Sequence, residues 1–279
     1  MAGIINWNNL WMEAMGSWRR RRGDMTAAFW DRRSRWLNEV VKSNDSSMQI
    51  ISKLEIDPSY TVLDIGAGPG TLTIPLAKRA KHVTVVEPSS GMLACLKENA
   101  ANEGLKNITC INRRWEEVIP GVNLDAHDLV IASHSLLMLD MKAALSKMNE
   151  VAERCVYLFY FAGASIPGYS ELWPRVYGEE FQAKPDYIGL YNILYEIGIY
   201  ANVEISKTEH KQRFSSLDEA VEEWKKNLGI SAPEAEEVIR SYLSVNLVKE
   251  GGAFYLKDGK KSVMIWWQKA ERGSVMANI

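Results

Sequence analysis

The sequence contains little of what marks secreted, membrane-spanning or metal-binding proteins. Of its 279 residues only three are cysteines, Cys95, Cys110 and Cys155, and none forms a CxxC pair or stands at ligand spacing from a histidine. We therefore expect free thiols in a reducing compartment and no metal site. No stretch reaches the roughly 20 apolar residues that a membrane-spanning helix needs, so we expect a cytoplasmic protein without a membrane span.

The sequence also lacks a strong charge, repeats and low-complexity tracts. Its formal net charge is −2, which provides no overall attraction to nucleic acid or to an anionic membrane. Hydrophobic residues make up 47% and charged residues 24%, as in ordinary globular proteins. We favour a single domain with insertions over two independent units.

What the sequence does have is a regular series of buried strands. The run TVLDIGAGPG (61–70) predicts a parallel strand through Val62, Leu63 and Ile65 that is closed by three glycines. Strand-like runs follow at 81–87, 108–111, 129–133 and 155–163, with helical patterns at 89–104 and 141–154 between them. This alternation predicts a doubly wound α/β sheet whose loops gather at one edge.

The two ends of the chain differ from this centre. Five of the ten tryptophans lie in the first 36 residues, and several follow helical spacing, which fits either a helix packed on the domain or a lid over the active site. Beyond Gly163 the pattern becomes loop-rich and aromatic. Two helices (217–228 and 233–245) and a hairpin near Gly251–Asp258 are expected there, as a substrate-side cap or an oligomer contact.

The first strand end suggests the ligand. Glycines at 66, 68 and 70 let a ligand approach the backbone closely, and Glu87, 21 residues after Gly66, can accept both hydroxyls of a ribose. A dinucleotide fingerprint would place its third glycine one position later, and Pro69 removes a backbone amide. Asp64 would repel a pyrophosphate and attract an ammonium group. A ligand with a ribose, a base and an ammonium group is S-adenosylmethionine, so an NAD-dependent oxidoreductase is disfavoured.

The motifs DIGAGPGTLTIPLA, VTVVEPS, INRRWEEV and DLVIASHSLLML together resemble the class I S-adenosylmethionine-dependent methyltransferases, in particular the small-molecule type with a UbiE-like core. The resemblance covers roughly residues 48–165. It implies a mostly parallel, seven-stranded Rossmann-like sheet and S-adenosylmethionine as cofactor. The expected parts are an N-terminal helical lid (1–47), the cofactor-binding core (48–165), and the rest of the sheet with a helical cap insertion at about 215–260 (166–279).

The resemblance also implies a role for individual residues. The methionine end of the cofactor would lie against Asp64, Gly66, Ala67 and Gly68, the ribose against Glu87, and the adenine against Pro88, Ser89 and Met92. Ser133 and His134 resemble the residues beside the sulfonium and the incoming acceptor. Many relatives have Gly-Asp-Ala after the third strand, where this chain has Arg113, Arg114 and Trp115. Recognition of the adenine amino group would then pass to Glu116 or to a backbone carbonyl, and the amide of Trp115 could still reach the edge of the ring. The alternative is that Trp115 is a core residue only.

The acceptor is less constrained than the cofactor. We expect a small-molecule acceptor, with Trp30, Tyr160 and Trp173 as candidate aromatic faces for the sulfonium. His134 is a candidate general base for a hydroxyl or carbon acid, because imidazoles ordinarily titrate near about pH 6.5, or else a histidine bonded to the backbone.

Two alternative functions stay open. An RNA or protein methyltransferase would use the arginines of Arg19–Arg22 and 32–35 for docking, although nucleic acid is not the favoured partner. The second alternative is a protein that binds the cofactor without catalysing methyl transfer. A homodimer is also left open.

Overall fold

In the computed structural model, the described residues are 5–22, 25–42, 46–163, 168–181, 183–229 and 233–269. They form two compact units. The first comprises the chain up to Tyr160, then Tyr187–Glu204 and the chain from Met264 onward. The second comprises Phe161–Asp186 and Ile205–Val263. The division of the chain into residues 1–47, 48–165 and 166–279 stays a prediction.

One mixed sheet holds the eight strands of the described residues. Seven follow the order β3-β2-β1-β4-β5-β8-β6, and β7 pairs with β8 as an antiparallel hairpin. The pairs among β1 to β5 are parallel. The predicted mostly parallel α/β sheet is therefore confirmed. The strands are β1 (Thr61–Ile65), β2 (His82–Val86), β3 (Ile108–Ile111), β4 (His127–Ser133), β5 (Ala152–Ala162), β6 (Asn202–Phe214), β7 (Leu247–Glu250) and β8 (Ala253–Gln268).

The register of three strands brings their following loops to the same level. Ile65 at the end of β1 lies opposite Val86 of β2 and Ala132 of β4. Each of these strands is buried almost throughout, as continuous β-branched and apolar runs require in a sheet covered on both faces. The residues that follow them therefore leave one edge of the sheet side by side, at the place where α/β folds bind ligands.

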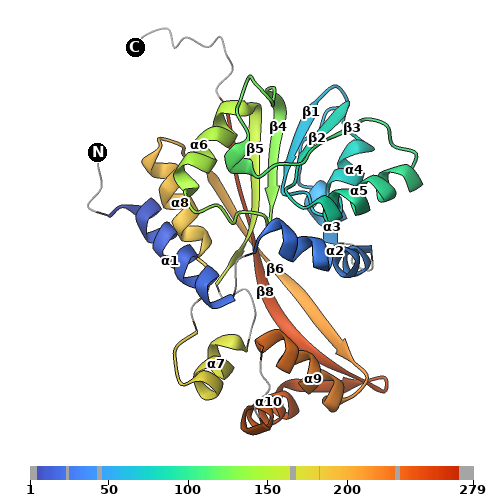
Figure 1. Cartoon of the computed structure of the whole chain (residues 1–279), viewed down its shortest axis with the longest axis vertical. Coiled ribbons are helices and arrows are strands. Elements are labelled where there is room, and N and C mark those ends of the chain that lie inside the picture. Colours follow the sequence, from blue (N-terminus) through green and yellow to red (C-terminus); the bar gives the residue numbers. More distant parts are fainter. Residues whose placement is uncertain are drawn as a thin grey trace. The chain divides into compact units, whose positions relative to one another are not determined.

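Helices cover both faces of the first unit. In Figure 1, α4 (Thr73–Ala77) and α5 (Ser90–Asn102) lie on one side of β1 and β2, with α3 (Ser46–Ile51) beside them. On the other side lie α6 (Met141–Val151) and α8 (Tyr187–Glu196). After the glycine loop, α4 begins at Thr73, three residues beyond Gly70. Because Pro75 has no amide to bond the carbonyl of Thr71, regular helix bonding starts later.

The N-terminal helices α1 (Trp7–Arg22) and α2 (Ala27–Lys42) pack on different neighbours. α1 buries Trp11, Met15 and Trp18, and the indole Nε1 of Trp11 donates to the carbonyl of Met138 at 2.9 Å. α1 packs against α6 and α8, and α2 lies along α5. The tryptophan stripe of α1 is thus buried, as in a helix packed on the domain.

The second unit has its own small core. The helices are α7 (Tyr169–Tyr177), α9 (Leu217–Leu228) and α10 (Pro233–Asn246), which agrees with the two helices predicted after residue 215. Leu172, Phe214, Trp224 and Leu243 are buried among them. The β7–β8 hairpin turns at Gly251 and Gly252, close to its predicted place.

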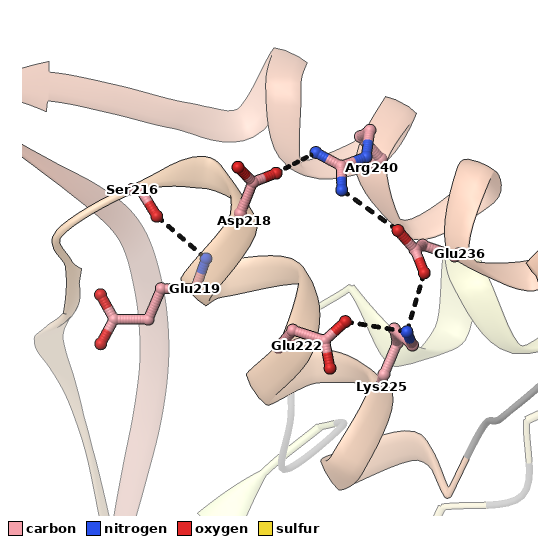
Figure 2. A network of polar contacts seen from close by, with 7 residues as sticks. All are labelled: Ser216, Asp218, Glu219, Glu222, Lys225, Glu236 and Arg240. Atoms are coloured by element: carbon pink, nitrogen blue, oxygen red, sulfur yellow. Dashed lines mark hydrogen bonds and ion pairs between the residues drawn. The ribbon is translucent and has the colours of Figure 1, made fainter.

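A chain of ion pairs joins the exposed faces of α9 and α10 (Figure 2). Lys225 bonds Glu222 and Glu236 at 2.8 and 2.7 Å, and Arg240 bonds Glu236 at 3.1 Å and Asp218 at 2.5 Å. Exposed pairs of this kind each contribute only about 0.2–1 kcal/mol. The apolar core therefore supplies most of the stability of this unit, and the network adds polar contacts between the two helices.

The close packing of α2 on α5 depends on Gly91. A Cβ at this position would lie 3.1 Å from Cα of Asp31 and 2.9 Å from Oγ of Ser34. We expect Gly91→Ala to lower the free energy of unfolding by about 1–2 kcal/mol, because overpacking against α2 outweighs the higher helix propensity of alanine. Urea unfolding measures the change. Gly16→Ala is the matched control in α1, since its Cβ would meet only a flexible arginine end, and it should be neutral or stabilising. An equal response of both variants would contradict the prediction.

Candidate functional site

A cavity of about 490 Å³ lies in the first unit, at the edge of the sheet where β1, β2 and β4 end. This volume is typical of a small-molecule site. The cavity brings together twelve site residues predicted from the sequence, from four separate segments of the chain. They are Asp64, Gly66, Ala67, Gly68, Glu87, Pro88, Met92, Arg114, Trp115, Glu116, Ser133 and His134.

The glycine loop after β1 has a conformation that requires glycine. Gly66 has φ 73°, and a Cβ there would lie 2.3 Å from Cβ of Ser135. Ser135 in turn donates from Oγ to the carbonyl of Ile65 at 2.5 Å, and the amide of Gly66 donates to the carbonyl of Val86 at 2.7 Å. The loops after β1 and β4 are therefore locked together, with the backbone of the glycine loop facing the cavity.

Glu87 is the polar centre of this edge. Its side chain is almost fully buried, yet it lines the cavity. Oε2 accepts from the amide of Gly68 at 3.0 Å and Oε1 from the amide of Ser89 at 2.9 Å. Burial raises the pKa of Glu87, and the two amide bonds partly oppose that rise. Each oxygen keeps a lone pair for a further donor, as recognition of a diol requires.

Asp64 is the second buried carboxylate. It is 2% exposed, and its Oδ2 accepts from the hydroxyl of Thr73 at 2.6 Å. Burial raises the pKa of Asp64 to about 6, and the nearby Glu87 adds to the rise. A buried acid with one neutral donor is stabilised as a carboxylate when a cation binds beside it. Sequence reasoning missed Thr73, although its place in the first turn after the glycine loop was a usable signal.

The segment after β3 forms another wall of the cavity. Trp115 is 3% exposed, and its indole Nε1 donates to the carbonyl of Ala144 at 3.2 Å. The ring therefore packs into the core, with the ammonium of Lys147 5.1 Å from its centre. Arg114 begins the short helical turn Trp115–Glu117, and its amide bonds Glu117. The backbone carbonyl of Trp115 is also engaged, since it accepts from the ammonium of Lys147 at 2.8 Å.

His134 has an uncommon backbone conformation. Among the described residues it alone, apart from glycines, has a positive φ, of 55°. Its amide donates to the carbonyl of Phe159 at 2.9 Å, which ties the loop after β4 to β5. A non-glycine residue in this region costs free energy, and such residues gather at functional sites.

The N-terminal segment up to α2 also contributes to the cavity wall; of its residues, Trp30 was predicted from the sequence as an aromatic face, whereas the others were not predicted to line the site. Arg19, Met25, Ala27, Trp30 and Leu37 all line the cavity. Arg19 also donates to the carbonyl of Leu137, so this arginine faces the cavity rather than an outer docking surface. The side chains of Arg21 and Arg22 lie outside the described residues.

Of the three aromatic candidates for the sulfonium, only one lines the cavity. Trp30 does so, whereas Tyr160 packs against Trp11 and Trp173 belongs to the second unit.

Within the described ranges, no three His, Cys, Asp or Glu side chains come together as metal ligands would. No helix in the described part of the chain is long and apolar enough to cross a bilayer.

Comparison with known proteins agrees with this geometry. The methyltransferase-domain family Methyltransf_25 matches residues 62–154, the segment from β1 to the start of β5. The chain carries a class I S-adenosylmethionine-dependent methyltransferase domain. The match includes the glycine loop, Glu87 and His134. The enzyme is a methyltransferase, and its cofactor is S-adenosylmethionine.

Individual relatives extend the comparison without fixing the acceptor. An uncharacterized protein of Haemophilus influenzae is 29% identical over 248 residues, covering 85% of this chain and 88% of that protein. The 23S rRNA (uracil(1939)-C(5))-methyltransferase RlmD of Klebsiella pneumoniae is 42% identical over 64 residues, but these are 23% of this methyltransferase and 15% of the relative. The crystal structure of YcgJ from Bacillus subtilis has the same fold, with a TM-score of 0.56 and 15% identity over 81% of this chain and 98% of that one.

The hydrogen-bond acceptors in the cavity fit this cofactor. A buried carboxylate at position 64 suits an ammonium group, and a second at position 87 has free lone pairs for a ribose diol. Gly68, with φ 56°, has no atom within 4 Å of where its Cβ would be, so space for a ligand is left above the loop.

Binding of the amino-acid end of the cofactor should depend on pH through Asp64. A proton must leave this carboxyl before it can pair with an ammonium group, so affinity for S-adenosylhomocysteine should fall about tenfold for each pH unit below about 6. Titration calorimetry from pH 5 to 8 measures this. 5′-Methylthioadenosine lacks the ammonium group, so the pH dependence of its affinity reports only on the groups that contact the adenosyl part.

In Asp64→Asn, the affinities of the two ligands should depend on pH in the same way. Parallel pH profiles of the two ligands in the wild-type protein would refute the role given to Asp64.

Proposed function

We propose that this methyltransferase transfers a methyl group to a small-molecule acceptor inside the cavity of the first unit. The observation that carries the proposal is the wall that Arg19 of α1, Met25, and Ala27 and Trp30 of α2 add to this edge of the cavity. This wall is mostly apolar, with one guanidinium. A cavity of about 490 Å³ suits a cofactor together with a compact acceptor better than a macromolecule.

Each wall of the cavity has a proposed role toward the cofactor. Asp64 pairs with the ammonium group, and the backbone of 66–68 faces the methionine end. Glu87 accepts the ribose hydroxyls through charge-assisted bonds worth about 1.5–3 kcal/mol each. Pro88 and Met92 border the adenine, and the segment 114–116 lies at its edge. Ser133 and His134 stand where the acceptor approaches.

S-Adenosylmethionine supplies a methyl group on a positively charged sulfur, ready for in-line displacement. The protein has mainly to align the acceptor and exclude water, and alignment alone can lower the barrier by about 7–11 kcal/mol. Trp30 offers an aromatic face that can stabilise a cation. No base is needed for an amine or thiol acceptor, whereas a hydroxyl acceptor must lose a proton, for which His134 is placed.

Two further points stay predictions: one adds to this proposal, and the other is an alternative to it. One is the capping role of the helices between about 215 and 260. The other is an RNA or protein acceptor, for which the exposed side chains of Arg32, Arg33 and Arg35 on α2 would provide the docking surface. Arg35 already pairs with Glu98, and the guanidinium of Arg33 stacks on Phe29, which weakens that alternative.

The acceptor class can be tested with methyl-labelled S-adenosylmethionine. A cell extract is split by ultrafiltration into a small-molecule filtrate and a macromolecular retentate, and each is incubated with the enzyme. We expect label in the filtrate only, and the Glu87→Ala variant as the negative control should give none. Label in the retentate that ribonuclease or protease removes would overturn the small-molecule proposal. Labelling of neither fraction would favour a non-catalytic role.

His134 should affect turnover without affecting cofactor affinity. We expect His134→Ala to lower kcat by about 10²–10⁴-fold for a hydroxyl acceptor, the usual contribution of a general base, with unchanged binding of S-adenosylhomocysteine. Alanine at this position must adopt the same positive φ as histidine, so the variant removes the imidazole under the same backbone conformation. His82→Ala is the matched control, since His82 bonds Thr109 far from the cavity edge. A kcat that does not change at any pH would remove His134 from acid–base chemistry.

A further inference from the structure

Asp31, in the second turn of α2, contacts the loop that carries Glu87. Its Oδ1 accepts from the hydroxyl of Ser89 at 2.6 Å and from the amide of Gly91 at 2.7 Å. These two donors hold the pKa of Asp31 below its usual value. The carboxylate also lies at the N-terminus of α5, where the helix dipole favours a negative charge. A side chain from the N-terminal helices therefore caps a helix of the sheet domain.

Ser89 connects this contact to the cofactor site. Its amide donates to Oε1 of Glu87 at 2.9 Å, and its hydroxyl oxygen accepts from the amide of Met92 at 3.1 Å as the N-cap of α5. Ser89 is fully buried. Asp31 is thus joined through this one residue to the carboxylate of Glu87, whose other oxygen bonds the glycine loop at Gly68.

A second polar link lies two turns further along α2. Oδ1 of Asn38 accepts from Nδ2 of Asn99 at 2.7 Å, and the same Nδ2 lies 2.9 Å from the carbonyl of Pro69 in the glycine loop. Asn38 is buried. One link therefore reaches the Glu87 loop and the other the glycine loop. Between them Gly91 allows the backbones of α2 and α5 to approach closely.

We propose that Asp31 is a positioning residue for the cofactor, which holds Glu87 in its binding conformation through Ser89 and so makes binding of the adenosyl end depend on the seating of α2. The inference rests on the proposed role of Glu87. Asp31 itself needs no contact with the cofactor. Trp30, the next residue along α2, lines the cavity, so the helix that orients the cofactor loop also forms the acceptor wall.

Titration calorimetry with S-adenosylhomocysteine and 5′-methylthioadenosine tests this. We expect Asp31→Ala to weaken both ligands by about tenfold or more, and to the same extent, because both contain the ribose. Asp31→Asn keeps an oxygen that can accept both hydrogen bonds, and it should restore affinity to within about threefold of the wild type. Ser89→Ala, which keeps the Gly91 bond, should give an intermediate loss for both ligands.

The matched control is Arg35→Gln, which breaks the exposed pair between Arg35 and Glu98 on the same two helices. It should leave both affinities unchanged. An equal loss in this control would show general loosening of the helix pair and overturn the inference, as would wild-type affinities in Asp31→Ala or a failure of Asp31→Asn to restore binding.

The Glu87→Gln variant separates the inference from the proposal on which it rests. If Glu87→Gln binds both ligands normally, the proposed role of Glu87 is wrong. If it binds them weakly while Asp31→Ala binds normally, only the inference about Asp31 fails.

Discussion

The site depends on one hydrogen bond between two loops, from the amide of Gly68 to the carboxylate of Glu87. The glycine loop follows β1 and the acid follows β2, and the two strands end in register. This bond holds a carboxylate that burial alone would tend to protonate. It also joins the glycine loop to the acid that we propose for the ribose. Everything else around the cavity either supports these two loops or encloses the space between them.

The central part of the site could be predicted from sequence because its signals are local. The strand at 61–65 is continuous and apolar, and it is followed at once by glycines at 66, 68 and 70, of which Gly66 has no room for a side chain. Parallel strands carry their following loops to a common edge, so Asp64, Glu87 and Ser133 could be placed together without coordinates. The helices at 217–228 and 233–246 were equally readable from their periodicity and caps.

The rest of the site depends on contacts between segments that are distant in sequence. Asp31 and Ser89 are 58 residues apart, and Arg19 meets Leu137 across 118. No local pattern pairs them. One signal was present: Ser34 and Asn38, polar residues that are buried, share a face of α2 with Ala27 and Asp31 at helical spacing. A helix whose inward face is small and polar is suited to pack closely on another helix and to bond with it, not to sit on an apolar core.

The position of α2 links the two halves of the reaction. Adjacent residues of this helix face different partners: Trp30 lines the cavity, and Asp31 caps α5 beside the ribose acid. If Glu87 holds the ribose as proposed, binding of the adenosyl group stabilises the loop at Glu87, and by thermodynamic linkage it also stabilises the seated position of any element that holds that loop. An acceptor that packed against Trp30 would favour the same position of α2. Cofactor and acceptor are therefore expected to bind cooperatively, although no contact between them is needed for that effect.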